Sequence, residues 1–382
     1  MTDGQTFLLV FILIYLSDCL IWLPPSGYAV LAFSRRHFLV RRAAVSFHAV
    51  RKGFAVLQPL PPFGTVFAGQ AWTLSLDREG IAPLSRENPN PGPAITAPPG
   101  ARHLTWSEIE TIRAEETKLL VNGRTYAITA TAAAALDLAH SLERVLNASE
   151  TDREKAISKV IARSLNARRT ARKARLFFRA VRGLRWNASI LFFAVFFVIP
   201  YAYWRFEDDP PFYYTLLAVW LVMCQIVVEF WMLHRRFYPT LGTERWTHAI
   251  LSILFPHYAM RSIDVLSRGF LAESHPLAVA VALADRGELE RFADRLRRDA
   301  LNPIPFSGED PALASRAEHF RLHVFLPAVE RLLSGMPDLQ EPAIEGRTSH
   351  PDEVSECPRC RIPYDRIGLV CQDCGGIPTV PL

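Results

Sequence analysis

Three apolar runs, each close to the length of a membrane-spanning helix, place the strongest limit on how this chain can fold. They cover residues 7–23, 188–204 and 213–233. About 20 apolar residues in a helix cross the hydrocarbon core of a bilayer, where backbone groups must be bonded within the segment. The sequence therefore predicts a multi-domain membrane protein with three transmembrane α-helices. The first of them is interrupted by Asp18.

Basic residues beside these runs predict their orientation. Eleven Lys or Arg and no acidic residue lie between residues 155 and 185, and further Arg residues follow the first and third runs. The loop 205–212 is net acidic. Because cytoplasmic loops carry an excess of Lys and Arg, we expect residues 1–6 to form an extracytoplasmic tail. The main domains and the C-terminus would then be cytoplasmic, at an inner membrane.

The last 26 residues contain four of the six cysteines, Cys357, Cys360, Cys371 and Cys374, as two C-x-x-C pairs. Two thiolates separated by two residues can bind one metal ion, and two such pairs supply the tetrahedral set that Zn²⁺ prefers. Four cysteines close the coordination sphere, so we expect a structural zinc within 357–376. Redox dithiols or an iron–sulfur cluster are the alternatives.

This cysteine pattern resembles the short zinc ribbons appended to many bacterial membrane and regulatory proteins. Such ribbons bind protein or nucleic acid, or serve as structural caps. Arg361 stands where these knuckles often have glycine. Residues 362–364 and 367–370 are predicted to pair as a small hairpin across the spacer between the two cysteine pairs.

Residues 43–147 contain short β-rich runs, a hairpin signal at Asn122-Gly123 and a final Ala/Leu-rich helix over 131–146. The apolar stripe expected on that helix is Leu136, Ala139, Leu142 and Val145. Strands closed by one C-terminal helix resemble a pleckstrin-homology-like domain, and the stretch 104–112 carries much of the likeness. The resemblance implies an α+β domain that binds phospholipid headgroups or peptides, although a fold alone specifies no ligand.

Residues 151–187 are predicted to form one basic amphipathic helix that runs into the second span. Five arginines at spacings of four, three, four and three share one face: Arg168, Arg172, Arg175, Arg179 and Arg182. Phe177, Val181 and Leu184 occupy the opposite face. The pattern suits binding to an anionic leaflet, and a solvated face that only sets topology is the alternative. Few aromatic residues are present for base stacking, which argues against nucleic acid.

Beyond the third span, residues 243–335 are predicted to be helical and 337–356 to form a flexible linker rich in Pro, Ser and acidic residues. The apolar stretch 248–255 ends at Pro256 and is predicted to be juxtamembrane. His319 and His323 are four residues apart and could share a metal ion, but no H-E-x-x-H pattern is present.

Two further groups could carry chemistry. Five polar residues beside the membrane could form an acid–base site: Glu244, His248, His257, Asp264 and His275. Glu229 lies inside the third span, where it could be functional or could simply pair with Arg235 or Arg236.

No phosphate-binding loop, nucleophile elbow or dinucleotide fingerprint is present. The features found are binding features, so the sequence favours a membrane-anchored, cytoplasm-facing adaptor or sensor for lipid headgroups or protein partners. The alternatives are a membrane-interface enzyme that uses the 244–275 set and an accessory subunit of a transport complex in which Glu229 faces a helix bundle.

Overall fold

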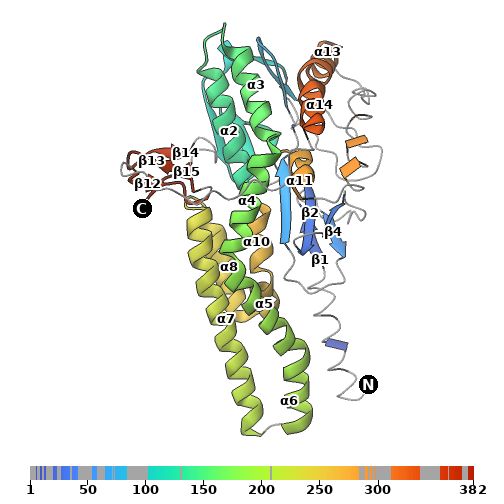
Figure 1. Ribbon diagram of the computed structural model, residues 1–382, viewed down its shortest axis with the longest axis vertical. Helices are drawn as coiled ribbons and strands as arrows, with labels where there is room; N and C mark the ends of the chain where they lie inside the picture. The colour runs from blue at the N-terminus through green and yellow to red at the C-terminus, as the bar shows by residue number, and fades with distance from the viewer. Residues whose placement is uncertain are drawn as a thin grey trace. The chain divides into compact units, whose positions relative to one another are not determined.

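A computed structural model of the 382-residue chain is mostly helical, with several small sheets (Figure 1). It describes residues 102–129, 131–206, 209–283, 311–335, 353–359, 361–371 and 377–382, and before these 20–23, 27–34, 37–41, 54–57, 65–70, 72 and 74–83. Single positions are also described at 6, 9, 10, 13, 289, 290, 293, 294 and 297. The chain divides into two compact units, and each is described by itself.

Unit 1, which comprises residues 1–22, 55–66 and 175–267, contains the two long apolar helices. The first is continuous from α5 (Arg182–Phe193) through a π-helical turn η2 (Ala194–Val198) into α6 (Ile199–Phe206). The second is α7 (Pro210–Phe237), which begins at a Pro-Pro pair suited to a first helical turn. The two run side by side as a hairpin (Figure 1).

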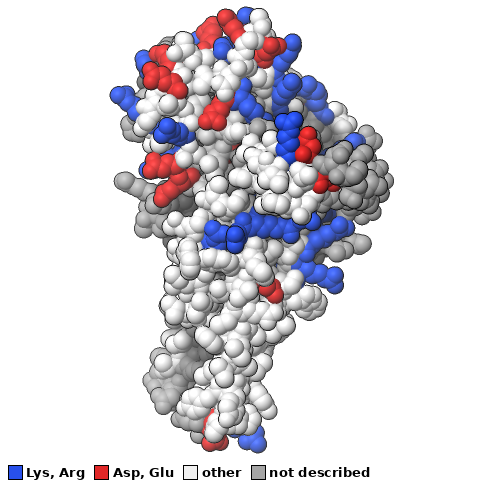
Figure 2. Space-filling view, turned by 90° about the vertical axis from the view of Figure 1, so that its left-hand side faces the viewer, with Lys and Arg blue, Asp and Glu red and all other residues white. Residues whose placement is uncertain are grey.

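These two helices, of 25 and 28 residues, are long and apolar enough to cross a membrane. Only 28% of the most apolar stretch of the first helix and 22% of that of the second are buried, whereas the core helix of a soluble protein would be mostly buried. In Figure 2 the surface over this part of the molecule is largely uncharged, and basic side chains gather at its upper end. Two of the three predicted spans therefore correspond to candidate membrane helices among the described residues.

The first apolar run differs from its prediction at its C-terminal end. Leu20–Leu23 form a strand, β1, which pairs with β4 (Phe54–Leu57). The expectation of one helix over 7–23 is therefore wrong for these four residues. Short apolar runs do not distinguish strand from helix by periodicity, and the Pro24-Pro25 pair disfavours helical backbone just before it.

Three further helices complete the described part of unit 1. α8 (Gly242–Leu254) packs on α7, and α9 (Pro256–Met260) and α10 (Ser262–Arg268) follow. Trp231 of α7 and Trp246 of α8 meet edge to face at 4.4 Å between ring centroids. The 13 residues of α8 are too few to span a bilayer, in line with a juxtamembrane placement of 248–255.

Unit 2, residues 23–54, 67–174 and 268–382, contains three antiparallel sheets in its N-terminal half. The first has the order β3 (His37–Arg41), β2 (Gly27–Ser34), β5 (Thr65–Gln70). The second is β6 (Leu74–Leu76), β7 (Gly80–Pro83), β8 (Leu104–Thr105), and the third is β9 (Ile112–Glu115), β10 (Lys118–Val121), β11 (Arg124–Ile128). Residues 45–50 and 88–100 of the predicted β-rich region 43–147 lie outside the described residues.

Helix α2 (Ala132–Leu146) begins at Thr131, whose hydroxyl accepts a hydrogen bond from the Ala134 amide. The helix predicted over 131–146 and the β10–β11 hairpin predicted at Asn122-Gly123 are confirmed. The predicted stripe is right for Ala139, Leu142 and Val145 but wrong for Leu136, which is exposed. The buried face instead includes Ala135 and Leu138.

One apolar core joins the second and third sheets to several helices. Leu76, Ile81 and Leu119 from the strands pack in the same cluster as Ile161 and Val329. Ile161 belongs to α3 (Arg153–Ser164) and Val329 to α14 (Leu326–Ser334). The outline of strands closed by a single helix is therefore incomplete, and the resemblance to a pleckstrin-homology-like domain is not confirmed.

The predicted single helix over 151–187 is divided. α3 ends at Ser164, α4 (Ala167–Ala180) follows, and α5 begins after Val181. The break between α3 and α4 lies at Asn166. Its side-chain oxygen accepts a hydrogen bond from the Arg169 amide at 2.9 Å, which is the geometry of a new N-cap. Polar caps of this kind favour a break that hydrophobic periodicity alone does not reveal.

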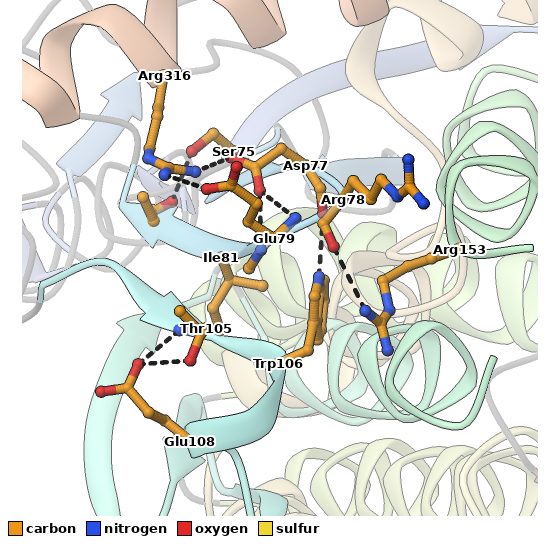
Figure 3. Close-up of polar contacts among 12 residues, drawn as sticks. Ser75, Asp77, Arg78, Glu79, Ile81, Thr105, Trp106, Glu108, Arg153 and Arg316 are labelled. Atoms are coloured by element: carbon orange, nitrogen blue, oxygen red, sulfur yellow. Dashed lines mark hydrogen bonds and ion pairs between the residues drawn. The ribbon is translucent and has the colours of Figure 1, made fainter. Parts of the chain in front are cut away.

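Helix α13 (Pro311–His319) is attached to the sheet turn between β6 and β7 by one arginine (Figure 3). Arg316 donates to Asp77 Oδ2 at 2.6 Å and to Glu79 Oε2 at 2.5 Å. Asp77 Oδ1 accepts the amides of Glu79 and Gly80, which holds the turn. Gly80 must lack a side chain, because a Cβ there would lie 2.0 Å from the Leu104 carbonyl oxygen.

We expect Arg316→Met to loosen α13. The variant removes a cation that two carboxylates share, and charged hydrogen bonds of this kind contribute about 1.5–3 kcal/mol. Amide hydrogen exchange over 311–319 should rise, whereas Arg331→Met on α14 should change little, because the Arg331 side chain donates to the Pro327 carbonyl of its own helix. Equal effects of the two variants would contradict this role.

Candidate functional site

The C-terminal ribbon region contains two small sheets. β12 (Ser355–Glu356) lies between β13 (Pro363–Tyr364) and β16 (Val380–Pro381), and β14 (Val370–Cys371) pairs with β15 (Ile377–Pro378). The predicted hairpin between 362–364 and 367–370 is therefore wrong. Each of its halves pairs with a neighbour from elsewhere in the ribbon instead.

Cys357 and Cys371 follow or end separate strands, yet both are fully buried in one cluster with Ile362, Tyr364 and Ile377. The cysteines Cys360 and Cys374 lie outside the described residues. Among the described residues no group of three potential ligands is found. The structure thus brings one cysteine of each pair into the same small core, which fits a shared metal and leaves the zinc itself a prediction.

The chain around Cys357 turns back on itself. The Arg361 amide donates to the Cys357 carbonyl, and the Cys357 amide donates to the Ile362 carbonyl, both at 2.9 Å. Arg361 has a φ of 60°, in the left-handed region that favours glycine. The residue that departs from the usual knuckle sequence therefore adopts the backbone conformation of a glycine, and it forms an ion pair with Glu356.

Arg359, inside the first knuckle, is buried in unit 2. Its Nη2 donates to the Gly269 carbonyl at 3.2 Å, and its Nη1 lies 3.4 Å from Glu273 Oε2. Its guanidinium also lies over the Phe270 ring, 5.7 Å from the centroid. The ribbon is therefore attached to the domain through a side chain that the sequence pattern did not single out.

Glu273 accepts a second cation from the opposite direction. Lys173 of α4 donates to Glu273 Oε1, and the side chains of Lys173, Glu273 and Arg359 are only 2%, 1% and 3% exposed. Charges removed from water persist only when they are paired and hydrogen bonded. We call these three residues the buried ion triad.

A second ion pair and a small cavity lie beside the triad. Asp137 of α2 pairs with Arg163 of α3, and burial raises the pKa of the Asp137 carboxyl although Arg163 opposes the shift. The cavity, of about 30 Å³, is lined in part by Trp72, Asp137, Arg163, Ser164 and Glu273. This volume suits about one or two water molecules rather than an organic substrate.

The five predicted lipid-facing arginines lie on α4 and at the start of α5. Arg168, Arg172, Arg179 and Arg182 are exposed and Arg175 is partly buried, whereas Phe177, Val181 and Leu184 are buried. The amphipathic division predicted from the spacing is confirmed. Nothing bound to this face is present, so its ligand stays a prediction.

Of the predicted acid–base set at 244–275, Glu244, His248, His257 and Asp264 belong to unit 1, where Glu244 is exposed. His248 is buried and hydrogen bonded to Ser262 at 3.0 Å, and Asp264 pairs with Arg261. Burial, with Arg261 nearby, lowers the pKa of His257. His275 belongs to unit 2, where its Nδ1 accepts the Leu277 amide. The histidines therefore serve local packing in the described parts of both units.

Glu229 has a local partner, and His319 at the end of α13 lies beside His323 in the π-helical segment Phe320–Phe325. Asn187 of α5 donates to Glu229 Oε1 at 2.7 Å, and Gly183 leaves room for the carboxylate. A hydrogen bond from the Asn187 side-chain amide on the neighbouring helix thus gives this carboxylate a partner. The rings of His319 and His323 lie 4.7 Å apart, and both residues are exposed.

We expect Glu273→Gln to destabilise the protein by about 3–5 kcal/mol, because it removes the buried carboxylate that Lys173 and Arg359 both contact. Glu330→Gln is the matched control, since Glu330 pairs with Arg297 at the surface and such pairs contribute about 1 kcal/mol or less. Thermal unfolding in mild detergent should show a much larger fall in Tm for Glu273→Gln than for Glu330→Gln. Similar falls would show that the triad is not a buried charge network.

No family model, no curated protein and no solved structure matches the chain. Its function therefore has to be argued from its own residues and their arrangement.

Proposed function

We propose that this protein is a membrane-anchored adaptor or sensor whose main domains and C-terminus face the cytoplasm. The helical hairpin of α5–α6 and α7 is the anchor, and the first apolar run is a further membrane segment of this proposal. The β-rich part with α4 would engage anionic lipid headgroups or a membrane partner, and the zinc ribbon at 357–376 would serve protein contacts.

The division of α4 and early α5 into an arginine face and an apolar face carries this proposal. Exposed Arg168, Arg172, Arg179 and Arg182 stand immediately before a helix able to span a bilayer. Basic residues at this position meet the anionic cytoplasmic leaflet, where each contributes roughly 1 kcal/mol of attraction. Guanidinium groups also bind phosphate in a bidentate manner, which suits lipid headgroups.

A membrane-interface enzyme fits the arrangement less well. Three of the residues that such an enzyme would use, His248, Asp264 and His275, are buried, and His248 is hydrogen bonded to Ser262. The cavity beside the buried ion triad holds about 30 Å³, too little for a substrate of ordinary size. Binding remains the function that the described residues support best.

The triple variant Arg168→Gln/Arg172→Gln/Arg179→Gln should lose selectivity for anionic lipid. Purification in mild detergent with equal amounts of phosphatidylglycerol and phosphatidylcholine, followed by lipid mass spectrometry, would measure the retained ratio. The loss of three surface contacts should reduce the phosphatidylglycerol preference about tenfold or more.

The control carries the same loss of charge on other helices, as Lys155→Gln/Lys159→Gln/Arg331→Gln. These three residues are exposed on α3 and α14. The control should keep the lipid preference of the unaltered chain. Equal losses in both triple variants would reduce the effect to net charge and overturn the proposed lipid face.

We expect one zinc ion per chain by elemental analysis of the purified protein. Four cysteine thiolates would hold it, with Cys357 and Cys371 already within one buried cluster. Cys357→Ser/Cys371→Ser should abolish the metal, whereas Cys224→Ser, on α7, should retain it. Iron in place of zinc, or no metal, would contradict the proposed centre.

A further inference from the structure

The position of Arg359 connects the metal centre to the interior of unit 2. Arg359 lies between Cys357 and Cys360, so the backbone that would wrap the metal also presents this side chain. Within unit 2 its guanidinium contacts Gly269, Phe270 and Glu273, all of which are buried. A knuckle folded around a metal is rigid, and a knuckle without metal loses its fixed turn.

Removal of Glu273 and removal of Arg359 from the buried ion triad differ in their electrostatic cost. Glu273 is the single carboxylate between two cations, so without it two like charges remain buried. Without Arg359 the neutral pair of Lys173 and Glu273 survives. Glu273 is therefore essential to the domain, whereas Arg359 can leave it at a much smaller cost in electrostatic free energy.

Two residues of the triad also lie close in sequence to two of the points where the chain passes between the units. Lys173 is two residues before Arg175, where unit 1 resumes, and Glu273 is six residues after Ser267, where it ends. Segment 269–280, which contains Glu273, is buried throughout. Within unit 2 the triad therefore joins the ribbon to the segments that lead into and out of the membrane-helix unit.

We propose that the ribbon is a zinc-dependent latch. The metal holds the first knuckle in the turn that inserts Arg359 beside Glu273, and removal of the metal withdraws Arg359 and loosens segment 269–276. The inference rests on the zinc centre of the proposed function and adds its regulation. While the latch is closed, Arg359 is committed to its own chain, so metal loss frees the ribbon for another acidic partner surface.

Hydrogen exchange on the full-length protein in mild detergent tests the latch, with zinc content measured on the same samples. Chelation of zinc should raise amide exchange over 269–276 about tenfold or more, the change expected for a lost charged hydrogen bond. Arg359→Met should raise exchange over 269–276 to the same extent while zinc stays bound and the ribbon strands near 355–371 stay protected.

Arg361→Met is the matched control. Arg361 is the next arginine in the same knuckle, but its ion pair is with Glu356 inside the ribbon. This variant should leave exchange over 269–276 unchanged. Unaltered exchange in Arg359→Met, or after chelation of a chain that does contain zinc, would overturn the latch and leave the zinc centre standing. A chain purified without zinc would overturn both.

Discussion

Glu273 is a carboxylate almost without access to water, and it is paired with Lys173 from α4 and Arg359 from the ribbon. A buried charge costs several kcal/mol unless it is paired, so each of these elements must be in place for the others to be stable. The surrounding hydrogen bonds follow the same logic. The Thr170 hydroxyl is hydrogen bonded to the Ser274 hydroxyl, and the His275 amide donates to the Ser164 carbonyl, so the residues directly after Glu273 are tied to α3 and α4.

Helix α4 carries both exposed arginines and a buried lysine. Arg168, Arg172 and Arg179 point outward, whereas Lys173, one position from Arg172, is buried. Successive residues are about 100° apart around a helix, so adjacent basic residues readily occupy different environments. The outward arginines support the proposed lipid face. The inward lysine belongs to the buried ion triad, so the proposed lipid face and the triad share one helix.

The elements with strong local signals could be predicted from the sequence. Thr131 caps α2, Asn122-Gly123 turns the β10–β11 hairpin, and the long apolar helices follow from length and composition alone. The predictions were wrong where one sequence pattern is compatible with two structures. Leu20–Leu23 is apolar enough for a span but pairs as a strand, and Leu136 sits beside the buried stripe because the helix faces neighbours whose positions the sequence does not specify.

The candidate sites divide in the same way. The sequence by itself determined the four cysteines that would bind one metal and the arginine face of α4, because both depend on spacing within a short segment. Only the tertiary structure decided that Arg359, Glu273 and Lys173 meet. Lys173 and Arg359 each lie about a hundred positions from Glu273 in the sequence, and no periodicity relates them. A buried ion pair has no local signature, since its free energy depends on the water excluded by the folded chain around it.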